Sequence, residues 1–214
     1  MNDKLFWNFC VFMYDFWHNL EYKSYQNVAN YILEDIVGSE QILEIACGTG
    51  ILTQEITCHY NNLDYTAIDY ARKMINICER KKINAQFEVG DATNLTYLDK
   101  SFDKIIIANA LHIMPNSECV LQEAKRCLKD DGILYAPNFL TPSTFKEKFV
   151  LDIIHKFGYN VYNEFTRDSF INFLIQNGLV VNKNEVYQGC FRSMLYTSCS
   201  KQSENVKLKL IRSD

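Results

Sequence analysis

The chain has 214 residues, of which 48% are hydrophobic and 22% charged, and its formal net charge is −4. These values are typical of one globular domain that is long enough to bury a core. The acidic balance argues against a nucleic-acid-binding surface, and no stretch approaches the ~20 apolar residues that are needed to cross a bilayer.

The cysteines also bear on the class of protein. The chain has eight of them, at positions 10, 47, 58, 78, 119, 127, 190 and 199. None forms a C-x-x-C pair and most have apolar neighbours, so we expect buried, reduced thiols in a cytoplasmic protein and no metal site. The aromatic N-terminus is interrupted by Asp3, Lys4 and Asp15 and has no small-residue cleavage site, so no targeting segment is expected.

Two helices are predicted before the first strand. Residues 5–20 have helical spacing and are apolar on nearly all sides, so this helix needs contacts on two sides. It is interpreted as a lid over an apolar pocket, with a membrane-facing or subunit-facing surface and simple core packing as alternatives. A second helix is predicted over residues 24–37 and ends at Gly38.

Strands and helices then alternate along the middle of the chain. Strands are predicted at 41–47, 63–69, 85–91, 102–109 and 132–139, and helices at 51–59, 71–82 and 116–129. Such alternation indicates a parallel sheet with right-handed crossovers and helices on both faces. The continuous apolar run Ile105-Ile106-Ile107 is typical of a central strand that is buried on both sides.

The last third has a different pattern. Helices are predicted at 143–157 and 167–177, followed by strands at 179–186 and 192–200 that form an antiparallel hairpin. The expected fold is therefore α/β, with a doubly wound, seven-stranded, mostly parallel sheet that a C-terminal hairpin completes. The chain is expected to be one domain, with residues 1–38 as an N-terminal helical lid, 39–140 as the core and 141–200 as the closing helices and hairpin.

A small-residue turn joins the first strand to the next helix. It reads Glu44-Ile45-Ala46-Cys47-Gly48-Thr49-Gly50. Small residues let the backbone approach a ligand closely, and a helix N-terminus offers free N–H groups. The dinucleotide fingerprint G-x-G-x-x-G is excluded because its third glycine position is Thr53, and the Gly-Lys-Ser/Thr ending of a phosphate-binding loop is absent.

Two aspartates follow the next two strands at their carboxyl ends, where doubly wound sheets bind ligands. Asp69 can accept the hydroxyls of a ribose or cap the helix that begins at Ala71. Asp91 can accept an adenine amino group or stabilise a turn. Tyr70 and Met74 are placed to flank a flat base, although Met74 also fits the apolar stripe of its helix.

These features occur in the order of a known family. The E-x-A-x-G-x-G turn, Asp69, Asp91 and the segment 102–115 resemble the motifs of class I S-adenosylmethionine (SAM)-dependent methyltransferases. The resemblance runs from about residue 40 to 140, and the distal hairpin fits the family's closing strands. The similarity is greatest to the small-molecule branch with a type 11/25 methyltransferase domain, which contains quinone-biosynthesis enzymes. The family usually has glycine at the position of Ala46, so a slightly altered turn is expected.

The resemblance implies a Rossmann-like fold and SAM as the cofactor. The backbone of the turn would hold the methionyl part, Asp69 the ribose, Asp91 and Ala92 the adenine, and the backbone at Asn109 the methionyl amine. Glu44 would orient the turn or a water. Tyr14, by analogy, would lie at the edge of the cofactor or pack within the first helix. The expected cofactor-binding set is Tyr14, Glu44, Ala46, Cys47, Gly48, Gly50, Asp69, Tyr70, Met74, Asp91, Ala92 and Asn109.

Methyl transfer from a sulfonium is a direct displacement, so positioning supplies most of the catalysis. A base is needed only for a protonated acceptor, and His112 is the predicted base, with a hydrogen-bonded structural histidine as the alternative. Asn109-Ala110-Leu111-His112 differs from the Asn/Asp-Pro-Pro-Tyr of nucleic-acid methyltransferases and lacks acidic metal ligands.

A small apolar or aromatic acceptor is therefore expected, with no integral membrane association. A non-catalytic SAM-binding regulatory protein and a nucleotide-dependent oxidoreductase are the alternatives. No motif in the last third identifies the acceptor or the oligomeric state.

Overall fold

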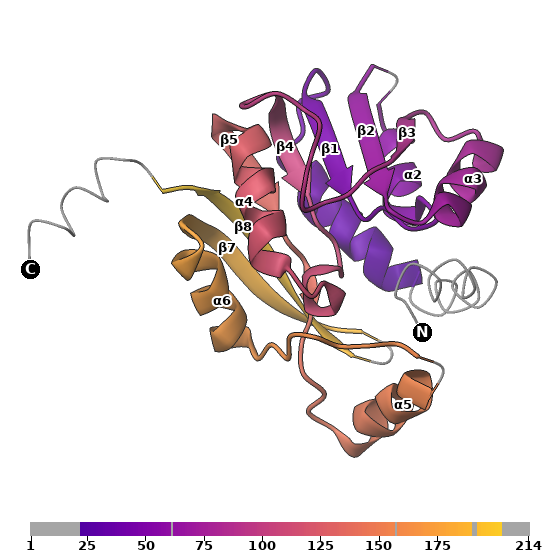
Figure 1. Cartoon of the computed structure of the whole chain (residues 1–214), viewed down its shortest axis with the longest axis vertical. Coiled ribbons are helices and arrows are strands. Elements are labelled where there is room, and N and C mark those ends of the chain that lie inside the picture. The colour runs from indigo at the N-terminus through magenta and orange to yellow at the C-terminus, as the bar shows by residue number, and fades with distance from the viewer. Residues whose placement is uncertain (1–21, 61, 157, 190–191, 203–214) are drawn as a thin grey trace, which may run out of the picture.

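The computed structural model describes residues 22–60, 62–156, 158–189 and 192–202 (Figure 1). The predicted aromatic helix at 5–20, and Tyr14 with it, lies outside these residues. The first described helix covers residues 22–33 and ends earlier than the predicted 24–37. After residue 33 the backbone tightens, because the N–H groups of Asp35 and Ile36 donate to the carbonyls three residues before them. The Glu40 carboxylate then accepts hydrogen bonds from the N–H groups of Val37 and Gly38.

The alternating middle of the chain forms the expected parallel sheet (Figure 1). Its strands lie in the order β3, β2, β1, β4 and β5, so the strand order reverses between β1 and β4. Helices α2, α3 and α4 connect them. The bounds are β1 Gln41–Ile45, α2 Ile51–Thr57, β2 Asp64–Asp69, α3 Arg72–Lys81, β3 Gln86–Val89, β4 Phe102–Ile106, α4 Ser117–Cys127 and β5 Leu128–Tyr135.

The sheet is buried on both faces, which explains its apolar strands. Alternate residues of β4 face opposite sides: Ile105 packs with α4 and α6 (Arg167–Gln176), whereas Ile106 packs with α2, α3 and the helix at 22–33. Both isoleucines are fully buried. The central strand is therefore held between two apolar layers, as the run Ile105-Ile106-Ile107 predicts.

An antiparallel hairpin closes the sheet, as predicted. β7 (Leu179–Gln188) pairs with β8 (Ser193–Lys201), and β8 also pairs with β5 and with the short β6 (Asn138–Phe139). β5 and β6 keep one register along β8, since Leu134 faces Cys199 and Asn138 faces Leu195. They are two parts of the predicted strand 132–139, broken at Pro137, which has no N–H to donate. The sheet thus has eight strands. Because β5 and β6 lie end to end, the eight strands occupy seven positions across the sheet.

The junction between α4 and β5 differs from the prediction. The helix ends at Cys127 instead of residue 129, and β5 begins at Leu128 instead of Gly132. Leu128 is fully buried and pairs with Phe102, after which the register shifts before Ile133 pairs with Lys104. Asp130 and Asp131 are exposed in this irregularity, so their polar sequence does not mark the start of the strand. Helix α5 (Phe145–Lys156) lies between β6 and α6, at one end of the molecule (Figure 1).

Candidate functional site

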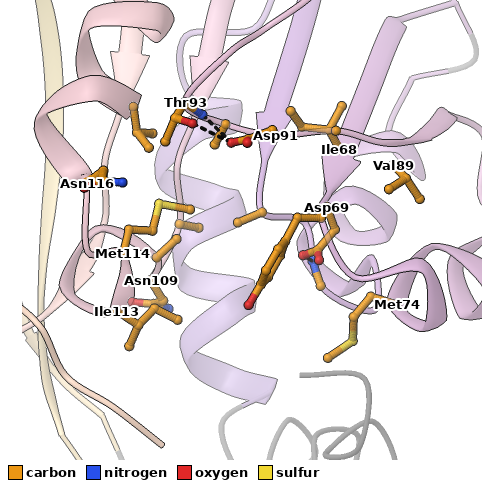
Figure 2. A pocket seen from close by; sticks show the side chains of 18 of the residues that line it. Ile68, Asp69, Met74, Val89, Asp91, Thr93, Asn109, Ile113, Met114 and Asn116 are labelled. Carbon is orange, nitrogen blue, oxygen red and sulfur yellow. Dashed lines mark hydrogen bonds between the residues drawn. The ribbon is translucent and has the colours of Figure 1, made fainter. Parts of the chain in front are cut away.

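A cavity of about 550 Å³ lies at the carboxyl ends of β1 to β4, beside the 3-10 helix η1 (Leu111–Ile113). This is the edge where the strand order reverses, and ligands bind there in doubly wound sheets. Eight residues of the predicted set line the cavity: Ala46, Gly48, Asp69, Tyr70, Met74, Asp91, Ala92 and Asn109. Figure 2 shows Asp69 and Met74 on one side and Asn109, Ile113 and Met114 on the other.

The small-residue turn after β1 adopts a left-handed backbone at three positions, with φ of 60° at Ala46, 56° at Gly48 and 76° at Gly50. A Cβ atom on Gly50 would lie 2.9 Å from Ile83 Cδ1 and 3.0 Å from Cys78 Sγ. Gly50 is therefore required both for its conformation and for the close approach of α3. Gly50 and Cys47 do not line the cavity but form the back of the turn.

Asp69 joins the turn to the start of α3. Its Oδ2 accepts a hydrogen bond from the Gly48 N–H at 3.0 Å, and its Oδ1 accepts one from the Ala71 N–H at 2.9 Å. Burial raises the pKa of this carboxyl to about 6, and the two N–H donors offset part of that effect. Asp69 thus holds the backbone just before α3 and lines the cavity with one side chain that is mostly ionised at neutral pH, whereas α3 itself has no side-chain cap.

Glu44 lies beneath the turn and does not line the cavity. Its Oε2 accepts hydrogen bonds from Thr53 Oγ1 at 2.6 Å and from the Tyr65 hydroxyl at 2.8 Å. The residue is 2% exposed, and burial raises its pKa to about 7 in spite of these two donors. Glu44 thus ties β1 to α2 and β2 and supports the turn from behind.

Asp91 forms a local turn at the far wall. Its Oδ1 accepts hydrogen bonds from the N–H of Thr93 at 2.9 Å and from the Thr93 hydroxyl at 2.7 Å (Figure 2). This is the turn role that the sequence offers as an alternative. Asp91 and Ala92 also line the cavity, and within the described residues the hydrogen bonds of Asp91 use only Oδ1, so Oδ2 can accept from a ligand while Asp91 holds the loop.

Asn109 combines an unusual backbone conformation with a buried, unpartnered side chain in the cavity lining. It has a left-handed φ of 52°, and its backbone N–H donates to the Pro137 carbonyl at 2.7 Å. Its side-chain Nδ2 and Oδ1 are both buried without a hydrogen-bond partner in the described part of the protein. Buried polar atoms without partners cost free energy, and a strained backbone beside them is common at binding sites. The amide is therefore available to a ligand.

The geometry does not support His112 as the general base. His112 is 1% exposed and does not line the cavity. Its Nδ1 lies 3.1 Å from Asn138 Oδ1, whose amide is oriented by a bond to the Phe139 carbonyl, so we assign the proton to Nδ1. Nε2 then accepts from the Tyr159 hydroxyl at 2.7 Å. Burial and the nearby Arg192 lower the pKa of His112 to about 3. The alternative of a hydrogen-bonded structural histidine agrees with these contacts.

One wall of the cavity was not assigned from the sequence. It consists of Asn116 and apolar residues from the end of η1, the loop that follows it and the first half of α4: Ile113, Met114, Pro115 and Val120. Most of this wall belongs to the segment 110–115, which follows β4 directly, and its place after a central strand is the feature of the sequence that could have identified it. Within the described residues, no group of three or more His, Cys, Asp or Glu side chains could hold a metal ion. None of the described helices is long and apolar enough to span a bilayer.

A doubly wound sheet with a small-residue turn and acidic residues at successive strand ends defines the class I methyltransferase fold. Solved structures share it: a SAM-dependent methyltransferase from Methanosarcina mazei has a TM-score of 0.68 at 19% identity, covering 81% of this chain and 98% of that one. A Thermotoga maritima protein titled a SAM-dependent methyltransferase, possible histamine N-methyltransferase, has a TM-score of 0.70 at 16% identity, covering 92% and 99%.

The sequence comparisons agree with the fold. Residues 42–132 match the family model described as a methyltransferase domain. A demethylmenaquinone methyltransferase from Thermotoga maritima is 35% identical over 119 residues, covering 56% of this chain and 51% of that protein. A phthiotriol/phenolphthiotriol dimycocerosates methyltransferase from Mycobacterium ulcerans is 32% identical over 100 residues, covering 46% and 37%. The chain thus spans about half the length of these relatives, or less.

Residues 42–132 thus match a methyltransferase domain, and the sheet has the fold of solved SAM-dependent methyltransferases, in agreement with the order of the motifs. SAM is the cofactor that this family and fold imply.

Proposed function

We propose that this protein transfers the methyl group of SAM to a small-molecule acceptor by direct displacement. The observation that carries the proposal is the position of Asp69, which links the turn after β1 to the start of α3 and lines the cavity. A buried carboxylate with two backbone donors is held in one orientation, and its remaining lone pairs can accept the two hydroxyls of a ribose.

The lining residues fit SAM in chemistry as well as in position. The turn would hold the methionyl part, Asp69 the ribose, and Asp91 with Ala92 the adenine between Tyr70 and Met74. The unpartnered amide of Asn109 offers a donor and an acceptor for polar atoms near the methionyl amine. When bound, SAM supplies an activated methyl group on a sulfonium. The contribution of the protein is to align the acceptor and to exclude water from the cavity.

We further propose an apolar or aromatic acceptor. The wall formed by Ile113, Met114, Pro115 and Val120 offers apolar contacts and few hydrogen bonds. The two relatives described above are named for methylation of demethylmenaquinone and of phthiotriol or phenolphthiotriol dimycocerosates, which are small molecules. The cysteines of the described residues are free thiols, which suits a cytoplasmic enzyme.

Isothermal titration with SAM and with its demethylated product tests the cofactor. Asp69→Ala is expected to weaken binding by about 100-fold, because it removes the charged acceptor that would make two hydrogen bonds to the ribose. Asp64→Ala is the matched control, since Asp64 is exposed at the opposite end of the same strand. Absence of binding by the wild type, or equal binding by Asp69→Ala, would contradict the proposal.

An acceptor screen with methyl-labelled SAM tests the reaction. Transfer of label to a small molecule is the expected result. Tight SAM binding without transfer to any compound would instead indicate the non-catalytic SAM-binding protein, and binding of NAD would indicate the oxidoreductase.

A further inference from the structure

Helix α5 buries none of its six apolar residues and exposes three of them. Within its twelve residues, all of which the structure describes, Glu147 is the one that is buried. Phe145 is 86% exposed, Phe149 57% and Ile153 38%. Large apolar side chains are common on surfaces one at a time, but three on one short helix form a patch. Figure 1 shows α5 at the end of the molecule, apart from the sheet.

The three side chains share one face. Phe145, Phe149 and Ile153 are four residues apart, so on a helix of 3.6 residues per turn they span an arc of about 80°. This stripe is narrower than the arc of about 100° or more by which a helix usually packs against a protein core. Its geometry suits shallow insertion better than full burial.

Basic side chains flank the stripe. On an ideal helix, Lys156 lies within the arc of the stripe, Lys146 lies about 20° beyond its edge at Ile153, and Lys148 lies about 60° beyond its edge at Phe145. All three are exposed and form no ion pair with a described residue. The opposing charge on this face is Asp152. Glu147 points inward, and His155 is exposed on the other flank. The helix is therefore locally positive on a chain whose net charge is −4.

The contacts of Glu147 keep the stripe turned outward. Its Oε2 accepts from the N–H groups of Ser143 and Thr144 at 2.8 and 2.9 Å, and its Oε1 accepts from the Ser193 N–H at 3.2 Å. These bonds fix the inner face of α5 to the start of β8. The stripe, on the opposite side, is thus presented by a helix whose orientation is set.

We propose that α5 is a docking surface for an anionic phospholipid bilayer, with the stripe Phe145–Phe149–Ile153 inserted among the headgroups and the lysines paired with lipid phosphates. Aromatic residues beside lysines on the exposed face of a helix are features that bind such an interface. After α5, the N–H groups of Tyr162 and Asn163 donate to the His112 carbonyl of η1. The segment that follows α5 is thereby attached to η1. The proposal does not depend on methyl transfer.

Co-sedimentation of the full chain with vesicles tests the docking. Binding is expected to vesicles of phosphatidylcholine with phosphatidylglycerol, to be much weaker with phosphatidylcholine alone, and to fall with added salt. The double variant Phe145→Ser/Phe149→Ser should lower the partition coefficient by about tenfold or more. Lys146→Glu/Lys156→Glu should lower it by about tenfold.

Matched controls are Leu98→Ser, at a residue that is 82% exposed in the loop before β4, and Arg80→Glu, at an exposed residue of α3; both should bind like the wild type. The affinity for SAM should be equal in all of these variants. A failure of vesicle binding would therefore not count against the proposed methyl transfer, and a failure of SAM binding would not count against the docking. No binding by the wild type, or unchanged binding by the phenylalanine variant, would overturn the proposal. A lower melting temperature of that variant, or its conversion from dimer to monomer, would also overturn it, because the stripe would then be covered by protein.

Discussion

Among single residues, Ala46 stands out because it holds a left-handed conformation that usually belongs to glycine. For an alanine, φ of 60° costs about 1–2 kcal/mol, and a glycine there would lose about 0.5–1 kcal/mol through its more flexible unfolded state. We therefore expect Ala46→Gly to stabilise the protein by up to about 1 kcal/mol in urea unfolding. Ala124→Gly, in the middle of α4, should instead destabilise it by about 1 kcal/mol or more. If Ala46→Gly and Ala124→Gly lowered the free energy of unfolding by the same amount, the backbone at Ala46 would be unstrained.

Glu44 makes the stability of the protein depend on pH. Burial raises its pKa to about 7, compared with about 4.3 in an unfolded chain. A raised pKa means that the contribution of this group is complete below about pH 4.3 and is lost as the pH rises toward about 7. Glu44→Gln keeps an oxygen for Thr53 and Tyr65 without the charge. The free energy of unfolding of Glu44→Gln, relative to that of the wild type, should therefore increase by about 2–4 kcal/mol as the pH rises from about 4.3 to about 7.

Urea unfolding of both proteins at several pH values measures this difference. The gap should be constant above about pH 7, where the carboxyl is ionised in both states. Glu44→Ala is the control, since it leaves the Thr53 and Tyr65 hydroxyls without their acceptor and should destabilise at every pH. A gap between glutamine and wild type that does not change with pH would mean that Glu44 is not buried as a carboxyl.

Among the helices and strands, α5 buries one side chain, Glu147, whose hydrogen bond from the Ser193 N–H attaches the helix to β8. Burial alone would raise the pKa of Glu147, but bonds from the N–H groups of Thr144 and Ser143 and from their hydroxyls lower it to about 2. A lowered pKa gives stability above about pH 4.3 that is lost as the pH falls toward about 2. Glu147→Ala should cost about 1–3 kcal/mol at neutral pH and make α5 sensitive to proteases. Asp152→Ala, on the exposed side of α5, should change neither property.

The helices and strands of the middle region were predicted to within a few residues because their apolar spacing repeats locally. The junction of α4 with β5 was predicted wrongly because Leu128 pairs with Phe102, and such a pairing leaves no local pattern. The break at Pro137 is of another kind, because it follows from a single residue that has no N–H to donate. The sequence predicts α5 as a helix, but its exposure depends on the contacts of Glu147 with β8, far along the chain.

For the molecule as a whole, the predictability of the site follows from the topology of the sheet. Asp69, Asp91 and Asn109 could be predicted to meet because parallel strands bring their carboxyl ends to one edge. The burial of His112 could not, since its partners Asn138 and Tyr159 are 26 and 47 residues away along the chain. Contacts between residues so far apart in the sequence depend on how several helices and strands pack. The positions of the strand ends depend only on the order of the strands in the sheet.

The two apolar layers predict an uneven distribution of stability over the molecule. β4 is buried on both faces, so its amides, such as that of Ile106, should exchange hydrogen only when the whole protein unfolds. α5 buries one side chain, so its amides should exchange through local opening at a free energy that is several kcal/mol lower. Addition of SAM should slow hydrogen exchange at the turn around Gly48 and at the segment around Asn109. Exchange in α5 should not change, since α5 does not line the cavity.

Hydrogen exchange with mass spectrometry measures β4, α5 and the cavity segments in one experiment. Equal protection of α5 and β4 would show that α5 is packed more firmly than its exposed side chains indicate.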